Sequence, residues 1–346
     1  MTSRLCALVL AVTAAATLAS QQPPPSPVGF GAANAIVAAD GSGTYKTVQE
    51  AIDAVPQNTS ASNRWTIFVK AGTYRERVYV QREKRFVRLA GEDAARTVIT
   101  FDLNATMAGP DGKPIGTFRT PTVTIDADDF TAENITFENS AGPVGQALAL
   151  RVDGDRIVFR RSRFLGWQDT IFLNRGRQYF EDSYISGHVD FIFGGATAYF
   201  ERCHLHCRRN GYITAASTPP EQRYGFVFAN GRITGEDNVR TYLGRPWRDF
   251  AQVTFMNTEM SDVVRPEGWH NWDRPEREKT SRYQEFASTG PGSTSRGRVP
   301  WARALTSSEA QSLNAASVLG GADGWTPSPD APAPASGRAR GSRPAR

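Results

Sequence analysis

Short stretches in which apolar and polar residues alternate recur through the middle of the chain. Four of them can be aligned at offsets of 27, 21 and 20 residues, on Ile135, Ser162, Ser183 and Cys203. A repeat near 20 residues that is built from short strands is typical of a solenoid. The pattern therefore predicts an all-β chain, folded as a parallel β-helix in which equivalent positions stack on successive coils.

Other elements follow from local signals. Thr47 precedes apolar residues at helical spacing, which predicts a short helix over residues 47–55 that caps the N-terminal end of the solenoid. Strands are expected at 65–70, 77–80, 86–90 and 98–101, and a Gly- and Pro-containing loop from 102 to 117. We expect the core coils at 120–260, projecting connections at 216–224 and 232–241, an aromatic segment packed along the coils at 262–302, and a helix at 307–314.

The two ends of the chain differ from its middle. Residues 1–20 hold one charge, Arg4, and an Ala-rich apolar run, which predicts a secretory signal peptide and a secreted protein, extracellular or periplasmic. Residues 21–35 are interpreted as a linker and 36–325 as one solenoid domain. The Pro-, Ala- and Arg-rich residues 326–346 predict a disordered tail. No other stretch is apolar enough to span a bilayer, so no membrane partner is expected.

Charge adds little to this picture. The formal net charge is +5, and the tail contributes +3 and Arg4 one more, which leaves +1 for residues 21–325. The tail could adhere to a polyanion, but a solvated end is the simpler interpretation. We expect a monomer with no nucleic-acid partner.

Two acidic motifs lie 21 residues apart, the first ending in Gln168-Asp169-Thr170 and the second beginning at Asp190. One coil of the repeat should place Asp169 and Asp190 on adjacent rungs, about 4.8 Å apart along the stack. Neighbouring carboxylates resist ionising together, so one of them should keep a proton. Gln146 and Gln168 are 22 residues apart, so their side-chain amides should also converge.

Five segments occur in an order that resembles the pectin methylesterases, and together they cover most of residues 36–302. They are Gly72-Thr73-Tyr74-Arg75-Glu76, Gln146-Ala147-Leu148-Ala149-Leu150-Arg151, Gln168-Asp169-Thr170, Asp190-Phe191-Ile192-Phe193-Gly194 and Leu243-Gly244-Arg245-Pro246-Trp247. The segment 211–217 looks closer to microbial members than to plant ones. The resemblance implies a single-stranded right-handed parallel β-helix that hydrolyses methyl esters of homogalacturonan, with water as co-substrate and no cofactor.

The resemblance also implies roles for individual residues. Asp190 is expected to be the nucleophile and Asp169 the general acid and base. The amides of Gln146 and Gln168 would form the oxyanion hole. Arg245 is expected to pair with Asp190 and keep it anionic. The expected substrate-binding residues are Thr122, Gln146, Phe191, Arg245 and Trp247.

One conflict is visible at this point. Strict alternation along a strand sends Gln168 and Asp169 to opposite faces of the sheet. Both can reach one site only if the chain bends there, and Gly166 just upstream makes such a bend possible.

The cluster Cys203-His204-Leu205-His206-Cys207 does not predict a metal site, because cysteines and histidines alternate in facing along a strand. On one straight strand the two cysteine Cα atoms would lie about 13 Å apart, so a disulfide needs a sharp turn between them. His188 is two residues before Asp190, but we expect it to support the reacting groups without reacting itself. No Gly-x-Ser-x-Gly nucleophile motif and no phosphate-binding glycine loop is present.

Three other interpretations remain open. A β-helix can also carry a pectin-cleaving lyase or hydrolase, although a calcium-dependent lyase would need several acidic ligands around the ion. The chain could be an inactive carbohydrate-binding solenoid, or an esterase for a different ester. None of the five motifs is visibly broken, which argues against loss of activity.

Overall fold

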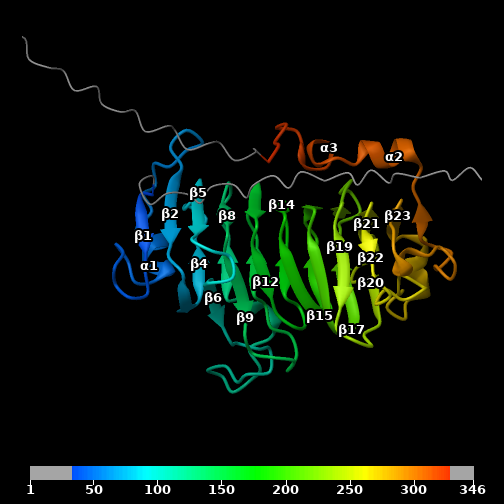
Figure 1. The fold of residues 1–346 in the computed structure, drawn as a ribbon, viewed down its shortest axis with the longest axis horizontal. Coiled ribbons are helices and arrows are strands. Elements are labelled where there is room, and N and C mark those ends of the chain that lie inside the picture. Colours follow the sequence, from blue (N-terminus) through cyan, green and yellow to red (C-terminus); the bar gives the residue numbers. More distant parts are fainter. Residues whose placement is uncertain (1–32, 328–346) are drawn as a thin grey trace, which may run out of the picture.

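The computed structural model describes residues 33–327. The chain winds into a long solenoid of parallel strands (Figure 1). One wall is an 11-stranded sheet, here the first sheet, in which all neighbouring strands are parallel. Its strands, in spatial order, are β1 (Ala35–Val37), β2 (Trp65–Val69), β5 (Val87–Gly91), β8 (Thr131–Glu133), β11 (Ile157–Arg160), β14 (Arg177–Glu181), β16 (Thr197–Glu201), β18 (Phe226–Ala229), β21 (Gln252–Met256), β23 (Arg282–Phe286) and β24 (Arg303–Ala304).

The other wall, the second sheet, has 13 strands and occupies two faces of the coil. On one face lie β3 (Gly72–Arg75), β6 (Thr97–Phe101), β9 (Thr136–Asn139), β12 (Arg163–Leu165), β19 (Arg232–Gly235) and β22 (Glu259–Met260). On the other lie β4 (Val78–Val80), β7 (Val123–Ile125), β10 (Leu150–Val152), β13 (Ile171–Leu173) and β20 (Thr241–Pro246). The long strands β15 (Tyr184–Gly194) and β17 (His204–Ala216) run through both faces and join them.

The register of the strands reproduces the sequence repeat. Arg163 pairs with Tyr184 and Tyr184 with His204, so the preceding residues Ser162, Ser183 and Cys203 stand on adjacent rungs. Directly after seven successive strands of the first sheet, one residue adopts a left-handed backbone, with φ between 47° and 57°: Asn134, Arg161, Asp182, Arg202, Asn230, Asn257 and Ala287. This repeated turn carries each coil from the first sheet into the second.

A ladder of aromatic rings fills the centre of the solenoid. Phe159, Phe180, Phe200, Phe228 and Phe255 stack in sequence with centroid distances of 4.7, 4.6, 4.3 and 4.5 Å. All five side chains are buried. The centroid spacing matches the distance between parallel strands, so each coil adds one ring to a continuous core.

Most predicted elements are present near the predicted bounds. Helix α1 (Val48–Asp53) begins after Thr47, whose hydroxyl accepts from the Glu50 amide in a reciprocal capping box. The Glu76 carboxylate accepts from the Val48 and Gln49 amides and ties this cap to the first coils. Strands β1 and β3 were not predicted.

Two predictions about the later coils were wrong. The segment 232–241 is not a loop throughout, because it contains strand β19. The segment 262–302 does not pack along finished coils but continues them, since β23 pairs in parallel with β21 and β24 with β23. Short 3₁₀ helices η3 (Pro275–Lys279) and η4 (Pro291–Ser293) lie between these strands, and Trp269 stacks on Tyr283 at 4.3 Å in the core.

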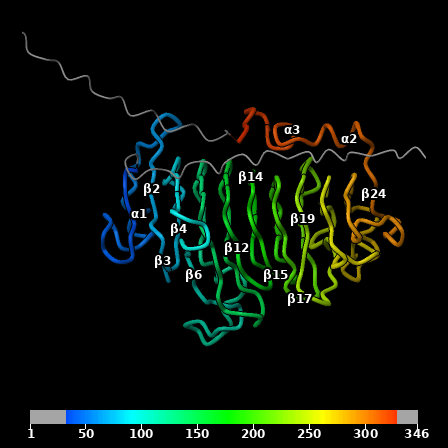
Figure 2. Tube along the Cα trace, in the orientation of Figure 1, coloured from blue at the N-terminus to red at the C-terminus, as the bar shows by residue number. Residues whose placement is uncertain are grey.

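After the last strand the chain turns back along the solenoid (Figure 2). The predicted helix is present as α2 (Ser307–Ser312) and is followed by α3 (Ala315–Leu319). Leu305, Leu313, Val318 and Leu319 pack on the outer face of the first sheet, against side chains that include Tyr179 and Tyr199. The C-terminal segment thus covers an apolar outer surface of several coils.

Cys203 and Cys207 are both buried and both free thiols. Cys203 lies in line with Ser162 and Ser183, as the repeat predicted. Within residues 33–327 no helix is long and apolar enough to cross a bilayer. The predicted signal peptide, nearly all of the predicted linker and all but the start of the predicted tail lie outside the described residues.

Candidate active site

Asp169 and Asp190 lie on adjacent rungs of the second sheet. Ile171 pairs with Ile192, and the Asp169 amide donates to the Val189 carbonyl at 3.0 Å, so the two aspartates occupy equivalent positions. Both have a left-handed backbone, with φ of 64° and 51°. The predicted one-coil relation between the two carboxylates is therefore present.

Both carboxyl groups are buried, with 8% and 6% of each residue exposed. Burial raises the pKa of Asp169 well above its usual value, and the neighbouring charge of Asp190 raises it further. Burial also raises the pKa of Asp190, but hydrogen bonds and charge from Arg245 oppose that rise. Hydrogen bonds from Arg245 act only on Asp190, and this difference favours the proton on Asp169 and the negative charge on Asp190.

Arg245 on β20 holds Asp190 through two hydrogen bonds. Its Nε donates to Oδ1 at 2.9 Å and its Nη2 donates to Oδ2 at 2.7 Å. The guanidinium carbon lies 3.9 Å from the ring centroid of Tyr212 and 3.6 Å from that of Trp272. These rings and the bidentate pair fix both the orientation and the charge of the Asp190 carboxylate.

Gln146 and Gln168 form a parallel bridge directly before β10 and β13. Both side chains are partly exposed, and neither amide group has a hydrogen-bond partner among residues 33–327. Their N–H groups are therefore free to donate to an oxygen atom of a ligand. Amide N–H groups without a partner are the donors that an oxyanion hole requires.

The conflict over Gln168 and Asp169 is resolved at Asp169 itself. Its left-handed backbone breaks the alternation of the strand, so successive side chains need not face opposite sides. Gly166 serves a different purpose from the one expected, because a Cβ there would lie 2.6 Å from the Thr170 hydroxyl oxygen. It allows close packing at the corner.

Aromatic side chains line the surface beside the aspartates. Outward-facing positions pair across the strands in the order Arg151, Phe172, Phe193, Ala215 and Arg245. Phe172 stacks on Phe193 at 4.7 Å.

Three further rings extend this aromatic surface. Trp247 lies 5.7 Å from Phe193, and Phe118 lies 5.0 Å from Phe172. Phe118 is largely exposed at the end of the long loop, and Trp272 packs into the same cluster. The rings are tilted against one another, and Phe118 and Trp247 are more exposed than Phe172 and Phe193, so they offer apolar surface of the kind that contacts sugar rings.

Sequence reasoning missed Tyr212, Phe118, Phe172, Phe193 and Trp272. A signal existed for two of them, since Phe172 and Phe193 each follow a site aspartate by three residues. Phe118 lies in the short 3₁₀ helix η2 (Thr117–Arg119) and Trp272 lies in the last coils, and no periodic pattern places a side chain at either position.

Two predicted substrate-binding residues are corrected. Phe191 is fully buried in the central core, so it cannot contact a bound sugar. Thr122 is also fully buried, and its hydroxyl donates to the Glu138 carbonyl at 2.8 Å. Trp247 and Arg245 do lie at the site.

His188, His204 and His206 make contacts with residues other than the two aspartates. The His188 ring packs edge-on against Trp167 at 5.8 Å, and burial lowers its pKa. His204 and His206 face outward and share the Thr234 hydroxyl, while Cys203 and Cys207 face the core. In the part of the chain that is described, no three His, Cys, Asp or Glu side chains are grouped to hold a metal ion.

Two adjacent buried carboxyl groups, one of them held by Arg245, and two amide groups without a partner suit acyl transfer through an aspartate nucleophile.

The sequence comparisons point in the same direction. A model of the Pectinesterase family matches residues 34–322. The chain is 45% identical to Pectinesterase 31 of Arabidopsis thaliana over 281 residues, which covers 79% of this chain and 88% of that protein. It is 38% identical to Pectinesterase 4 of the same plant over 303 residues, 83% of this chain, and spans about half (50%) of that longer protein. These relatives are plant proteins, so the predicted microbial type has no support.

Solved structures with the same fold include a pectin methylesterase from carrot, with a TM-score of 0.79 and 37% identity over 86% of this chain and 95% of that one. The pectin methylesterase PemA from Erwinia chrysanthemi gives a TM-score of 0.75 and 32% identity, covering 86% and 98%. A pectin methylesterase mutant in complex with a hexasaccharide gives the same values. The prediction of a right-handed parallel β-helix is confirmed.

Proposed function

The chain belongs to the pectinesterase family of carboxylic ester hydrolases, and we propose that it hydrolyses the methyl esters of homogalacturonan with Asp190 as nucleophile. The observation that carries the proposal is the buried pair of aspartates, of which Arg245 contacts one. The products are methanol and a pectin chain with one more free carboxylate.

In the first half of the reaction, an Asp190 oxygen attacks the ester carbonyl carbon and forms a tetrahedral intermediate. The amides of Gln146 and Gln168 donate to the new oxyanion. When the C–O bond to the methoxy group breaks, Asp169 gives its proton to the leaving oxygen and methanol departs. The raised pKa of Asp169 supports this role, because the group must be protonated before the reaction begins.

In the second half, Asp169 is a carboxylate and takes a proton from water. The resulting hydroxide attacks the galacturonyl carbonyl of the anhydride. The bond to the Asp190 oxygen then breaks, which releases the free acid and restores both aspartates to their starting states. Arg245 contacts Asp190 in the free enzyme, and it stabilises this carboxylate as leaving group.

The substrate is a polymer, and the surface beside the aspartates suits one. Phe118 and Trp247, which pack on the buried Phe172 and Phe193, offer apolar surface to sugar rings next to the reacting unit. A polymer of the plant cell wall is met outside the cell, and the predicted signal peptide over residues 1–20 supports secretion.

The direct test is release of methanol from methyl-esterified pectin by the full chain, with polymer length followed in the same sample. We expect methanol without shortening of the polymer, and the same rate with and without chelator. A lyase or hydrolase would shorten the chain. Full activity in an Asp190→Asn variant would refute the proposed nucleophile.

A further inference from the structure

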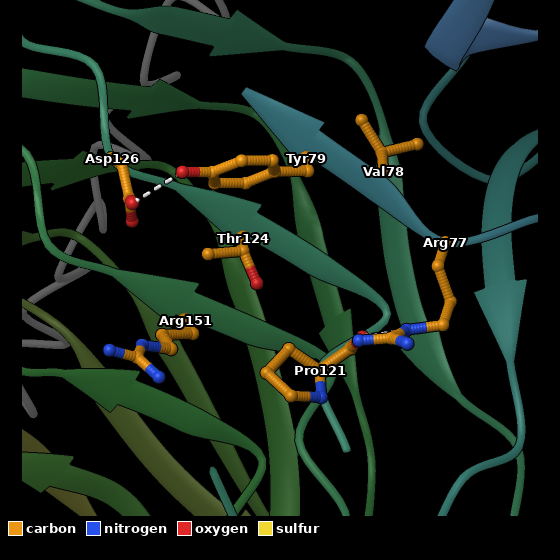
Figure 3. A pocket seen from close by; sticks show the side chains of 7 residues that line it. All are labelled: Arg77, Val78, Tyr79, Pro121, Thr124, Asp126 and Arg151. Atoms are coloured by element: carbon orange, nitrogen blue, oxygen red, sulfur yellow. Dashed lines mark hydrogen bonds between the residues drawn. The ribbon is translucent and has the colours of Figure 1, made fainter. Parts of the chain in front are cut away.

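Guanidinium groups along the second sheet differ in how closely aromatic rings enclose them. A cavity of about 460 Å³ lies over β4 and β7, on the N-terminal side of the aspartates, and Arg151 is part of its lining (Figure 3). The guanidinium carbon of Arg151 is 5.9 Å from the ring centroid of Phe172. That of Arg245, on the C-terminal side, is 3.9 Å from Tyr212 and 3.6 Å from Trp272. Two rings this close to one carbon must cover opposite faces of the planar group, so whatever places these rings also places Arg245.

The fold places the two rings in different ways. Tyr212 lies on β17 and pairs with Tyr242 of β20, and their rings stack at 5.3 Å, so the register of the sheet fixes Tyr212. Trp272 lies outside the strands, in a turn where Trp272 and Asp273 both have a left-handed backbone, with φ of 62° and 54°. This conformation is unfavourable for residues with a Cβ, so other contacts must hold the turn.

His270 supplies one of these contacts. The Trp272 amide donates to His270 Nδ1 at 3.0 Å, and a ring nitrogen accepts a hydrogen bond only when it carries no proton. The His270 ring lies against Tyr212 and Tyr242, with centroid distances of 5.6 and 5.2 Å, and its amide donates to the Gly244 carbonyl at 3.1 Å. His270 therefore connects β17 and β20 to the turn that carries Trp272.

Asn271 supplies a second contact. Its Oδ1 accepts from the Asp273 amide at 3.0 Å, and its Nδ2 donates to Glu278 on η3 at 2.7 Å. Each left-handed residue of the turn thus has its amide bonded by the side chain two positions before it. Side chains of the turn itself, more than the sheet, set its shape.

We propose that His270 is a positioning residue for the reaction: it holds the Trp272 turn, and the indole in turn keeps both N–H groups of Arg245 directed at Asp190. The inference deepens the proposed function and rests on it for the role of Asp190. Among residues 33–327, His270 has no hydrogen bond to either aspartate, so it acts through Trp272 and Arg245.

Loss of the turn would change the ionisation of Asp190. With one face uncovered, the guanidinium of Arg245 can tilt away from the geometry of its two hydrogen bonds. Burial raises the pKa of Asp190, and Arg245 opposes that rise, so a looser Arg245 should leave the pKa of Asp190 higher. Asp169, the other carboxyl group at the site, keeps its place on the neighbouring rung. The acid limb of kcat/KM should therefore move to higher pH.

The test separates the acceptor nitrogen of His270 from its ring. His270→Phe keeps a ring against Tyr212 and Tyr242 but cannot accept from the Trp272 amide. It should lower kcat for methyl-esterified pectin about two- to tenfold, change KM less than about twofold and move the acid limb to higher pH. His270→Asn loses the ring but can place an amide oxygen near the position of Nδ1, so kcat should stay within about twofold of the wild type.

A second pair of variants tests the indole. Trp272→Leu should lower kcat about three- to thirtyfold and move the acid limb in the same direction, and Trp272→Phe should recover most of the loss. The matched control is Trp325→Leu, because Trp325 also lies over an arginine, Arg177 at 5.6 Å, but on the outer face of the first sheet. It should change neither kcat nor the acid limb.

Two kinetic results would overturn the inference. If Trp272→Leu and His270→Phe raise KM and leave the acid limb in place, the turn only binds substrate. If His270→Asn loses as much kcat as His270→Phe, the acceptor nitrogen does not hold the turn.

A measurement without turnover keeps this outcome separate from that of the proposed function. Carboxyl-carbon NMR of the full chain with ¹³C-labelled aspartate follows the pKa of Asp190, whose signal is the one lost in Asp190→Asn. This pKa should rise in His270→Phe, and an unchanged value would also overturn the inference. If the wild-type chain releases no methanol from pectin but the rise is seen, the esterase proposal fails and the positioning of Arg245 by His270 stands.

Discussion

Asp182 and Asp190 are held by their neighbours in nearly the same way but lie in different surroundings. Each has a left-handed backbone, with φ of 49° and 51°. Each accepts two hydrogen bonds from an arginine on a later coil, at 2.8 and 3.1 Å from Arg202 and at 2.9 and 2.7 Å from Arg245. The side chain of Asp182 is 44% exposed, whereas that of Asp190 is 8% exposed.

The difference shows that backbone geometry and an ion pair do not by themselves make a reactive group. The Asp182 turn recurs on seven rungs and serves the fold. The corner with Asp190 adds burial, a second carboxyl group from Asp169 and two free amides. Water screens the first ion pair, but the second keeps its electrostatic strength in a dry site.

The largest expected effect follows from replacing these two aspartates in the same way. Asp190→Asn should lower kcat/KM for methyl-esterified pectin by about 10⁴-fold or more, because the nucleophile is lost. Asp182→Asn should change it less than about twofold, since an exposed ion pair contributes little. Methanol release measured on both variants checks the contrast, and similar losses in the two would contradict it.

Asp169→Asn should cost about 10²–10⁴-fold, because an amide cannot protonate methoxide or activate water. The pH profile sharpens the assignment. In the wild-type enzyme kcat/KM should fall as pH rises through the raised pKa of Asp169, since the acid is then ionised. The residual activity of the variant should lack this alkaline limb. If the variant keeps the alkaline limb at the same pH, a group other than Asp169 causes it.

Gln168→Ala should lower kcat by about 10²–10³-fold with little change in KM, because the amide is expected to donate only to the charge formed during reaction. Gln178→Ala is an informative comparison. Gln178 lies on the first sheet and donates to the Gly154 carbonyl at 3.1 Å, away from the site. Gln178→Ala should therefore reduce thermal stability and leave kcat unchanged. A rise in KM alone for Gln168→Ala would indicate ground-state binding.

A substitution in the repeated turn should lower stability and leave catalysis unchanged. Alanine is strained at the φ of 57° that Asn230 adopts, and Asn230→Ala also removes the hydrogen bond to Glu201. It should lower the free energy of unfolding by about 1–2 kcal/mol. Asn230→Gly should cost less, because glycine tolerates this conformation. Denaturant unfolding measures both, and kcat/KM should be unchanged.

Much of this fold could be predicted from the sequence because a solenoid depends on local repetition. The offsets between Ile135, Ser162, Ser183 and Cys203 correspond to the observed register, and the Thr47 cap marks helix α1. The coils after residue 260 were missed because their aromatic residues do not follow the earlier repeat. There the pairing of β23 with β21 comes from tertiary packing.

The site was predictable where one coil sets the spacing, and not where the chain bends. The strand is irregular between Val189 and Ile192, so Phe191 and Ile192 both enter the core while Phe193 packs in the aromatic cluster with Phe172. A count along an unbroken strand cannot find this irregularity. Trp272 reaches Arg245 from a distant loop, and nothing in its local sequence indicates that contact.

The smallest effect concerns stability. Because burial raises the folded-state pKa of Asp169 above its unfolded value, its contribution to stability is present at low pH and is lost as pH rises through the folded pKa. In Asp169→Asn the side chain keeps nearly the shape of aspartate but cannot ionise. The unfolding temperature of this variant should exceed that of the wild type on the alkaline side, and the difference should shrink toward acid pH. At Asp182 the same change removes an exposed ion pair and should give no alkaline gain. Thermal unfolding across the pH range separates the two positions: if both variants respond alike, the burial of Asp169 is not what sets its protonation.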